Sequence, residues 1–392
     1  MELEESMENN RPIRPVLVGE ESRLKNLVTH LSDLKRIALD TESNSFYAYQ
    51  ERLCLLQISS EDGDYLIDPM RGLDLTPLVA LLENPKTEKI FHTAESDIRI
   101  IKRELHCGIS PIFDVMVAAR FLGIKECGLS SLLQNYFGVT LNKKFQRANW
   151  ADRPLNEELI HYAAMDTHYL AGLREKLGLE LERRGLWHEV LEEFERISHI
   201  EPEPRLFDPN GFFKISGARN LHGRGLAVLR ELYLARESTS KATDRPPFKI
   251  LSNDLMIRLA LNPSAAVREL GSIRGVTPYI LHRHGHWIRE AVRVGLSAQE
   301  VVRSVRGVEM KQRYEPLKKR FNLLKAWRRD RAQGKGVEPD VILPGTVLNR
   351  IASANPSTEE ELLRIKGMGP LRLKSYAREI LNVLHLCAKE LR

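Results

Sequence analysis

The sequence has little cysteine and no long hydrophobic run. Its 392 residues include only four cysteines, Cys54, Cys107, Cys127 and Cys387, with no C-x-x-C pair. This pattern argues against a disulfide framework and fits a reducing cytosol, so we expect the thiols to be packing residues. No apolar stretch approaches the roughly 18 residues of a membrane helix. The opening stretch MELEESMENNRP is acidic and polar, unlike a signal peptide. We therefore expect a cytoplasmic protein that has no membrane partner.

Positive charge is scarce in the first half of the chain and abundant in the second. Residues 1–200 contain 24 Lys and Arg against 33 Asp and Glu, whereas residues 201–392 contain 35 against 20. This asymmetry suggests a nucleic-acid partner held mainly by the second half. The chain also lacks the G-x-x-x-x-G-K-[S/T] loop that cradles the phosphates of ATP, which excludes a helicase motor.

The first half alternates between strand-like and helix-like segments. The strand-like runs are RIALDT (36–41), LCLLQIS (53–59), DYLID (64–68), KIFH (89–92) and PIFD (111–114). Short turns join the first three runs, which predicts an antiparallel meander, and helical patterns separate the later ones. A single long helix is expected over 156–184. We predict an α/β domain at 15–198, with a mixed sheet and helices on its faces, after an acidic tail at 1–14.

The second half is entirely helical and repeats itself. A proline-containing linker is expected at 199–210. Beyond it, FKILSNDLMIRLALNP (248–263) aligns with DVILPGTVLNRIASANP (340–356), and IRGVTP (273–278) aligns with IKGMGP (365–370). Arg258 then corresponds to Arg350, and Gly275 to Gly367. Two copies of one small all-α domain are therefore predicted, at 211–296 and 315–392.

Four carboxylates and one phenol stand at positions that suggest a site. Asp40 and Glu42 are two residues apart at the end of a strand, so both side chains point to one face of the sheet. Asp97 stands near the start of a helix. Tyr162 and Asp166 are four residues apart on a helix, which places them on the same face. Each acid alone could instead be a turn or capping residue.

Carboxylates that converge on one cleft repel each other unless cations neutralise them. Two hard divalent ions, Mg²⁺ or Mn²⁺, would do so, and a pair of ions about 3.5–4 Å apart is the usual device for phosphodiester cleavage. Tyr162 could orient the attacking water. By contrast, Asp114 in PIFDVMV is expected only to cap the helix that follows it.

The order of these motifs resembles the tyrosine-containing branch of the DEDD exonuclease superfamily. The stretches IALDTES, LCLLQIS, FHTAESD, FDVMVAARFLG and GLSSLLQNYFGVTLNKKFQRANWADRPLNEELIHYAAMDTHYL are similar to bacterial ribonuclease D over most of residues 30–185. The resemblance implies a ribonuclease H-like fold and removal of nucleotides one at a time from the 3′ end of RNA, including transfer RNA precursors. By position it implies that metal is held by Asp40, Glu42, Asp97 and Asp166, and that Tyr162 positions the nucleophilic water.

The repeated helical domain resembles the HRDC domain, a nucleic-acid-binding module shared by ribonuclease D and RecQ-type helicases. In IKGMGP, Gly367 and Gly369 permit a tight turn that can bring backbone amides near a phosphate. The first copy has Thr277 at the second glycine position. A purely structural bundle is the alternative for both copies.

Further substrate contacts are expected at His92, which precedes Asp97 in the H-x4-D motif, and at Lys143 and Lys144 in the loop before the catalytic helix. A solvated loop is the alternative for the two lysines. The leading hypothesis is a metal-dependent 3′-5′ exoribonuclease, expected to be monomeric and to act on RNA with a single-stranded 3′ end. A DNA 3′-5′ exonuclease and a non-catalytic nucleic-acid-binding protein are the alternatives.

Overall fold

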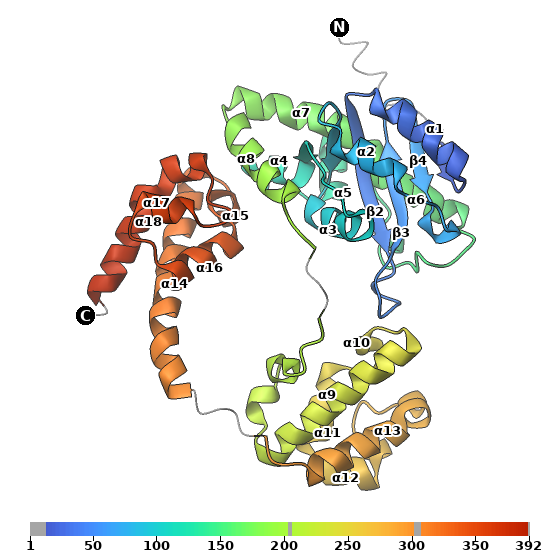
Figure 1. Cartoon of the computed structure of the whole chain (residues 1–392), viewed down its shortest axis with the longest axis vertical. Helices are drawn as coiled ribbons and strands as arrows, with labels where there is room; N and C mark the ends of the chain where they lie inside the picture. Colours follow the sequence, from blue (N-terminus) through green and yellow to red (C-terminus); the bar gives the residue numbers. More distant parts are fainter. Residues whose placement is uncertain (1–12, 203–205, 302–306, 391–392) are drawn as a thin grey trace. The chain divides into compact units, whose positions relative to one another are not determined.

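The structure is a computed structural model that describes residues 13–202, 206–301 and 307–390 (Figure 1). Most of the expected tail at 1–14 lies outside the described residues. The chain forms two compact units. The first contains residues 1–43, 53–203 and 309–392, and the second contains residues 44–52 and 204–308. The second helical region thus clusters with the α/β region, while the domain bounds expected from the sequence stay predictions.

A six-stranded mixed sheet forms the centre of the α/β region. Its strands are β1 (Val16–Val18), β2 (Arg36–Ser43), β3 (Leu53–Ser59), β4 (Asp64–Ile67), β5 (Glu88–Phe91) and β6 (Ile112–Asp114), in the order β1-β4-β3-β2-β5-β6. β3 pairs antiparallel with both β2 and β4, which confirms the predicted meander. Three further pairs are parallel: β1 with β4, β5 with β2, and β6 with β5. β1 was not predicted, because three residues are too few to show an alternating pattern.

Helices cover both faces of this sheet (Figure 1). They are α1 (Glu21–Ser32), α2 (Pro77–Glu83), α3 (Ala94–Leu105), α4 (Val115–Phe121), α5 (Leu129–Phe137), α6 (Glu157–His168), α7 (Leu170–Arg183) and α8 (Trp187–Ser198), with 3₁₀ turns at Pro69–Arg71 and Lys143–Phe145. The single helix expected over 156–184 is wrong, because the chain bends at Tyr169. α6 packs against β2, β3 and β4, whereas α7 packs against β2, β5 and α4, so one straight helix could not serve both sets of contacts.

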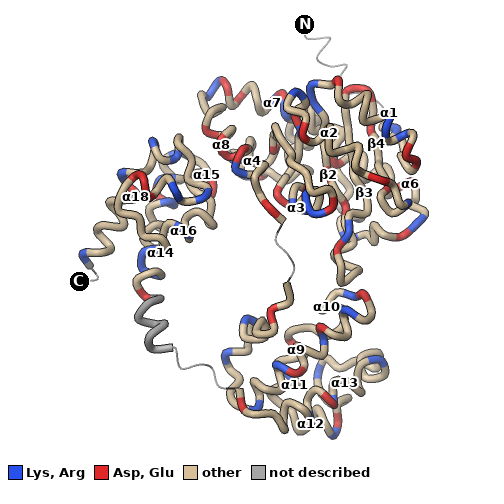
Figure 2. The backbone as a smooth tube through the Cα atoms, in the orientation of Figure 1, with Lys and Arg blue, Asp and Glu red and all other residues tan. Residues whose placement is uncertain are grey.

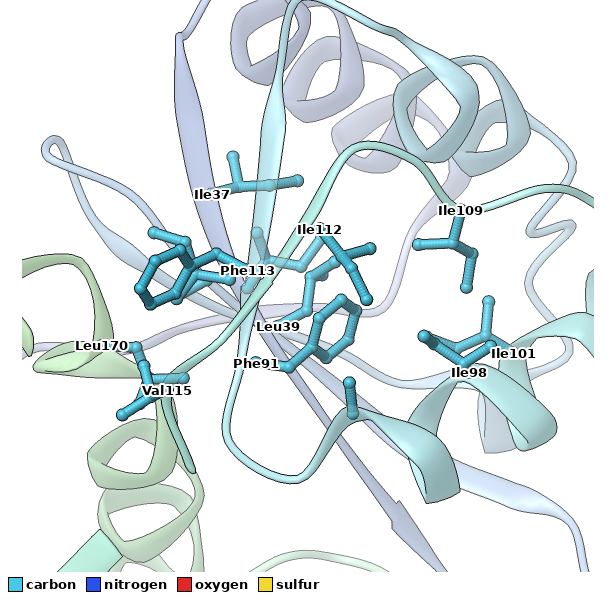
Figure 3. Close-up of a cluster of buried hydrophobic side chains, with 14 of the residues drawn as sticks. Ile37, Leu39, Phe91, Ile98, Ile101, Ile109, Ile112, Phe113, Val115 and Leu170 are labelled. Carbon is cyan, nitrogen blue, oxygen red and sulfur yellow. The ribbon is translucent and has the colours of Figure 1, made fainter. Parts of the chain in front are cut away.

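On β2, Ile37 and Leu39 of the largest hydrophobic core point to the face of the sheet opposite to Asp40, whereas Ala38 of the same core points to the face of Asp40. Figure 3 shows Leu39 of β2 beside Phe91 of β5, whereas Phe113 of β6, which is in register with Ile90 of β5 and so with Ala38 of β2, points to the face of Asp40. Because successive side chains of a strand point to opposite faces, the burial of Ile37 and Leu39 directs Asp40 and its neighbours at alternate positions to the other face. The packing of the core thus fixes which side of the sheet carries the acidic residues.

The two helical copies repeat the same elements in the same order. The first copy contains α9 (Gly223–Thr243), α10 (Pro247–Ile250), α11 (Asn253–Leu261), α12 (Pro263–Arg268) and α13 (Pro278–Ser297), with 3₁₀ turns at Gly211–Lys214, Ala218–Asn220 and Leu270–Ser272. The second contains α14 (Gly307–Lys335), α15 (Pro339–Ile342), α16 (Gly345–Ala354), α17 (Glu359–Leu363) and α18 (Pro370–Glu390). In Figure 2, acidic and basic residues are distributed along the backbone of both copies.

Equivalent contacts confirm the alignment of the two copies. The Nη1 atom of Arg258 donates to the carbonyl of Arg274 at 3.3 Å, and Nη1 of Arg350 donates to the carbonyl of Lys366 at 2.8 Å. The glycine that follows each of these carbonyls has a φ of +101° or +96°, a conformation that glycine adopts without strain. The repeat seen in the sequence is therefore a repeat of structure.

The four cysteines are free thiols, and three of them are buried, as expected for packing residues. Within the described ranges, no helix combines the length and the apolar character needed to span a bilayer.

Candidate active site

Three of the predicted carboxylates lie together at the end of β2 and on α6. Asp40, Glu42 and Asp166 each offer one oxygen atom, and these atoms all lie within 4.8 Å of one another. Asp40 and Glu42 share a face of β2, while α6 crosses the same face and brings Asp166 to it. The sequence motifs, which are more than 100 residues apart, therefore meet as predicted.

Asp97 joins this cluster from the first turn of α3. It is 4% exposed, and its carboxylate accepts hydrogen bonds from the backbone N–H of Thr41, at 3.1 Å, and from the hydroxyl of the same residue. Thr41 stands between Asp40 and Glu42 on β2. This contact fixes the start of α3 against the strand that carries the other two acids.

The start of α6 and two alanines position Tyr162 and Asp166. The side chain of Asn156 caps the helix by accepting from the N–H of Leu159 at 2.8 Å. Ala163 and Ala164 are fully buried, and such small side chains let the helix backbone approach the sheet closely. Tyr162 and Asp166 then line the same cavity, where each affects the pKa of the other.

Burial and mutual repulsion raise the pKa of every acid in the cluster. The pKa of Asp40 and that of Glu42 lie well above their ordinary values, first because the protein desolvates them and then because neighbouring carboxylates repel their charge. Burial and the charge of Asp40 likewise raise the pKa of Asp97. The pKa of Asp166 rises to about 7, mainly through burial, although the phenol of Tyr162 opposes the shift. Burial and the carboxylates also raise the pKa of Tyr162.

This donor set fits hard divalent cations. All its candidate ligand atoms are carboxylate oxygens, which are the ligands that Mg²⁺ and Mn²⁺ prefer. Burial and the charges of neighbouring carboxylates raise the pKa values of Asp40, Glu42, Asp97 and Asp166, so the cluster concentrates negative charge in a desolvated site. A bound cation would neutralise that charge.

The cluster opens into a cavity of about 360 Å³. The predicted residues Asp40, His92, Tyr162 and Asp166 line it. The imidazole Nε2 of His92 lies 2.9 Å from the carbonyl oxygen of Cys127, so this ring is held at the wall by the loop that precedes α5. The cavity therefore combines the acidic cluster with the histidine expected to contact substrate.

Sequence reasoning missed several other residues of the cavity wall. They include Ser130 and Ser131 in the first turn of α5, together with Asn142 and Gln146. α5 begins after Gly128, which has no side chain to cap the helix. The sequence signal was the stretch GLSS at a helix start without a capping side chain, a pattern that leaves backbone N–H groups available to an anion.

A second cavity of about 330 Å³ shares Leu141, Asn142 and Tyr162 with the first. Lys144 lines this second cavity, where its ammonium group lies 3.1 Å from Glu158 and 4.9 Å from the centre of the Phe145 ring. The side chain of Lys143 lies outside what the structure describes.

Gly367 and Gly369 do not belong to these cavities. Within the first unit, the backbone N–H of Leu371 donates to the carboxylate of Glu192 at 2.8 Å, and that of Arg372 donates to it at 3.4 Å. The amides at the start of α18, where the glycine turn was expected to meet a phosphate, therefore already hold a carboxylate. A phosphate contact at this turn stays a prediction and would require Glu192 to move.

Asp114 behaves as the predicted capping residue. Its side chain accepts from the N–H of Val117 at 3.0 Å, which caps α4, and from the N–H of Ala94 at 2.7 Å, at the start of α3. The hydrogen bonds that Asp114 accepts among the described residues come from the N–H groups at the starts of α3 and α4. We therefore do not count Asp114 among the candidate metal ligands.

Two known domain families match the chain. Residues 15–182 match the family described as 3′-5′ exonuclease, and residues 225–292 and 318–384 each match the HRDC domain. These matches cover the α/β region and both helical copies, in the order that the sequence motifs predicted.

Curated relatives and solved structures agree with these matches. The chain is 30% identical over 283 residues to ribonuclease D of Gluconacetobacter diazotrophicus, which covers 71% of this chain and 71% of the relative. It is also 30% identical over 290 residues to RRP6-like protein 2 of Arabidopsis thaliana, covering 69% of this chain but only 33% of that protein. The crystal structure of Escherichia coli RNase D, 23% identical, has the same fold with a TM-score of 0.66 and covers 95% of this chain and 99% of that one.

Proposed function

Because this chain belongs to the ribonuclease D family, we propose that it is a metal-dependent 3′-to-5′ exoribonuclease that releases nucleoside 5′-monophosphates. The observation that carries the proposal is the meeting of Asp40, Glu42 and Asp166, with one oxygen of each within 4.8 Å of the others, on the wall of a cavity. Several acids with raised pKa values in one cleft are characteristic of functional sites.

The four carboxylates and Tyr162 have different proposed roles. Asp40, Glu42, Asp97 and Asp166 would hold two divalent cations, Mg²⁺ or Mn²⁺. When bound, such ions activate a water molecule and stabilise the leaving oxygen of a phosphodiester. Tyr162, on the cavity wall, would orient the attacking water through its hydroxyl, and the hydrogen bonds from Thr41 would keep Asp97 in place.

The cavity suits the end of a single strand. Its volume of about 360 Å³ falls within the range of small-ligand sites, so it fits a terminal nucleotide but no duplex. His92 and Lys144 would contact the sugar-phosphate chain near the cut. We expect transfer RNA precursors with single-stranded 3′ ends to be the substrates, the two HRDC domains to bind the body of the RNA, and the protein to act as a monomer in the cytoplasm. The positive excess of residues 201–392 supports the role of the helical copies.

The test is the digestion of 5′-labelled RNA that carries a single-stranded 3′ tail, with Mg²⁺, with Mn²⁺ and with chelator. Products that shorten by one nucleotide at a time, only when metal is present, and a halt at the first stable duplex would support the proposal. A DNA strand of the same sequence serves as the control for sugar preference. Internal cuts, or full activity in chelator, would rule the mechanism out.

A further inference from the structure

Gln57 lies directly opposite Asp40 in the sheet. The two residues are partners in the antiparallel ladder of β2 and β3, so their side chains project from the same face at neighbouring positions. Gln57 is 0% exposed. A primary amide is therefore buried beside a carboxylate of the proposed metal site, although Gln57 does not line the cavity itself.

The amide of Gln57 is unpaired among the residues that the structure describes. Neither its Nε2 nor its Oε1 atom has a hydrogen-bond partner there. Ser59, the next polar residue on the same face of β3, does have hydrogen-bond partners. The hydroxyl of Ser59 lies 2.6 Å from that of Thr167 and donates to Asp64 at 2.8 Å. A buried polar group without a partner lowers the stability of the fold, so the presence of an unpaired amide at this position suggests a functional role.

The packing of α6 on β3 shows which residues surround the amide of Gln57. On either side of Gln57 along this face of β3, Leu55 packs in one cluster with Ala163, and Ser59 contacts Thr167. Gln57 therefore lies beneath the turn of α6 that carries Asp166, with Asp40 beside it on β2. The small Ala163 leaves that space to the amide rather than to a larger side chain.

We propose that Gln57 is a positioning residue of the metal site, whose amide N–H₂ group donates a hydrogen bond to the carboxylate of Asp40 when that carboxylate ligates a cation. The inference rests on the proposed function. Carboxylates that bind metal are themselves hydrogen-bonded, and loss of such an outer partner typically lowers metal affinity or activity 10- to 100-fold. The amide is neutral, so it orients Asp40 without competing with the cation for its negative charge.

Two apolar variants, Gln57→Met and Gln57→Leu, test the role because they remove the amide and fill the site with different shapes. Binding of Mn²⁺ to the full chain is measured by isothermal titration calorimetry, and the melting temperature is measured in chelator. We expect both variants to bind Mn²⁺ about 10- to 100-fold more weakly than wild type. We also expect both to melt in chelator at the same or a higher temperature, because an unpaired polar group has been removed.

Ser240→Ala is the matched control. Ser240 lies on α9, is 0% exposed, and has a hydroxyl that also lacks a partner among the described residues. Its replacement should leave Mn²⁺ affinity unchanged. Wild-type affinity in both Gln57 variants would overturn the inference. A lower melting temperature of both variants in chelator would also overturn it, because the amide would then have a stabilising partner without metal. If wild type itself binds no Mn²⁺, it is the proposed function that fails.

Discussion

Tyr162 and Asp166 line the same cavity one turn apart on α6, and the phenol of Tyr162 lowers the pKa of the Asp166 carboxylate. This interaction opposes the effect of burial. In the structure the phenol thus stabilises a proposed metal ligand in its charged form. In the proposed mechanism, the same hydroxyl orients the attacking water once cations neutralise Asp166.

Changing Tyr162 to Phe should lower the turnover number by about 10²- to 10⁴-fold, the usual contribution of one positioned polar group in catalysis. RNA affinity should change little, because the ring and its contacts with Phe145 and Trp150 are kept. Single-turnover cleavage rates and filter binding of the same RNA measure the two effects separately.

The control for this variant is Tyr169→Phe, which removes a phenol hydroxyl at the end of α6 that does not line either cavity of the site. It should cleave at the wild-type rate. If Tyr162→Phe does so as well, Tyr162 only packs and the role given to it is wrong.

Stability in chelator should fall as the pH rises through about 7. The pKa of Asp166 is about 7 in the folded protein, whereas the ordinary value for an aspartate is 3.8. The folded state therefore holds this proton more tightly than the unfolded state. The stabilising contribution is complete below the unfolded-state value and is lost as the pH rises through the folded-state value. Urea denaturation in chelator from about pH 3 to about pH 8, a range that spans both values, measures the decline.

Asp166→Asn should show a weaker decline over the same pH range, because the amide cannot lose a proton. Saturating Mg²⁺ or Mn²⁺ should also reduce the decline in wild type, because cations bind the deprotonated carboxylates and stabilise the folded state more as the pH rises. A stability curve that stays flat over this range in chelator would contradict the raised pKa.

Changing Lys144 to Ala should weaken RNA binding and reduce its dependence on salt. Each phosphate that a protein no longer neutralises on a single strand lowers the slope of log affinity against log salt by about 0.7. Because Lys144 lines the cavity next to Tyr162 but is not a proposed ligand, KM should rise more than the turnover number falls. Lys25→Ala on α1 is a control, since that side chain is exposed on an element outside both cavities. An unchanged slope in Lys144→Ala would assign Lys144 to the solvated loop.

The sequence was sufficient for the parts of the site that depend on short-range patterns. Asp40 and Glu42 share a face because strand side chains alternate, and Tyr162 and Asp166 share one because they are one helical turn apart. The three predicted meander strands were also found, since each carries its own run of apolar residues.

Features that depend on tertiary contacts could not be predicted. The bend at Tyr169 follows from the different packing of α6 and α7. The place of Gln57 opposite Asp40 depends on the register of β2 and β3, which no local pattern reveals. The carboxylate of Glu192 at the start of α18 comes from a helix about 180 residues earlier. Such contacts join segments far apart in the sequence, and neither segment alone carries a sign of the other.

The last prediction distinguishes a metal site from acids that merely cap or turn the chain. In chelator, the crowded carboxylates repel each other, and Asp40→Asn removes one of the charges. The variant should therefore melt at the same temperature as wild type or at a higher one in chelator. It should lose cleavage activity and most of the stabilisation that wild type gains from Mg²⁺ or Mn²⁺, because a ligand is missing. Differential scanning calorimetry with and without metal measures both effects.

Asp114→Asn is the matched control, because Asp114 is a buried acid whose carboxylate caps α4 and contacts the start of α3. Replacing it should destabilise the fold by about 1–3 kcal/mol whether or not metal is present, because Asn has only one side-chain oxygen and cannot accept from the N–H groups of both Val117 and Ala94, so one buried donor is left unpaired. The two variants thus change stability in opposite directions in chelator and differ in their response to metal. If Asp40→Asn instead behaves like Asp114→Asn, with lower stability in chelator and the full response to metal, then Asp40 is not a ligand. The two-metal mechanism would fail with it, because the remaining acids could not hold both cations at the end of β2.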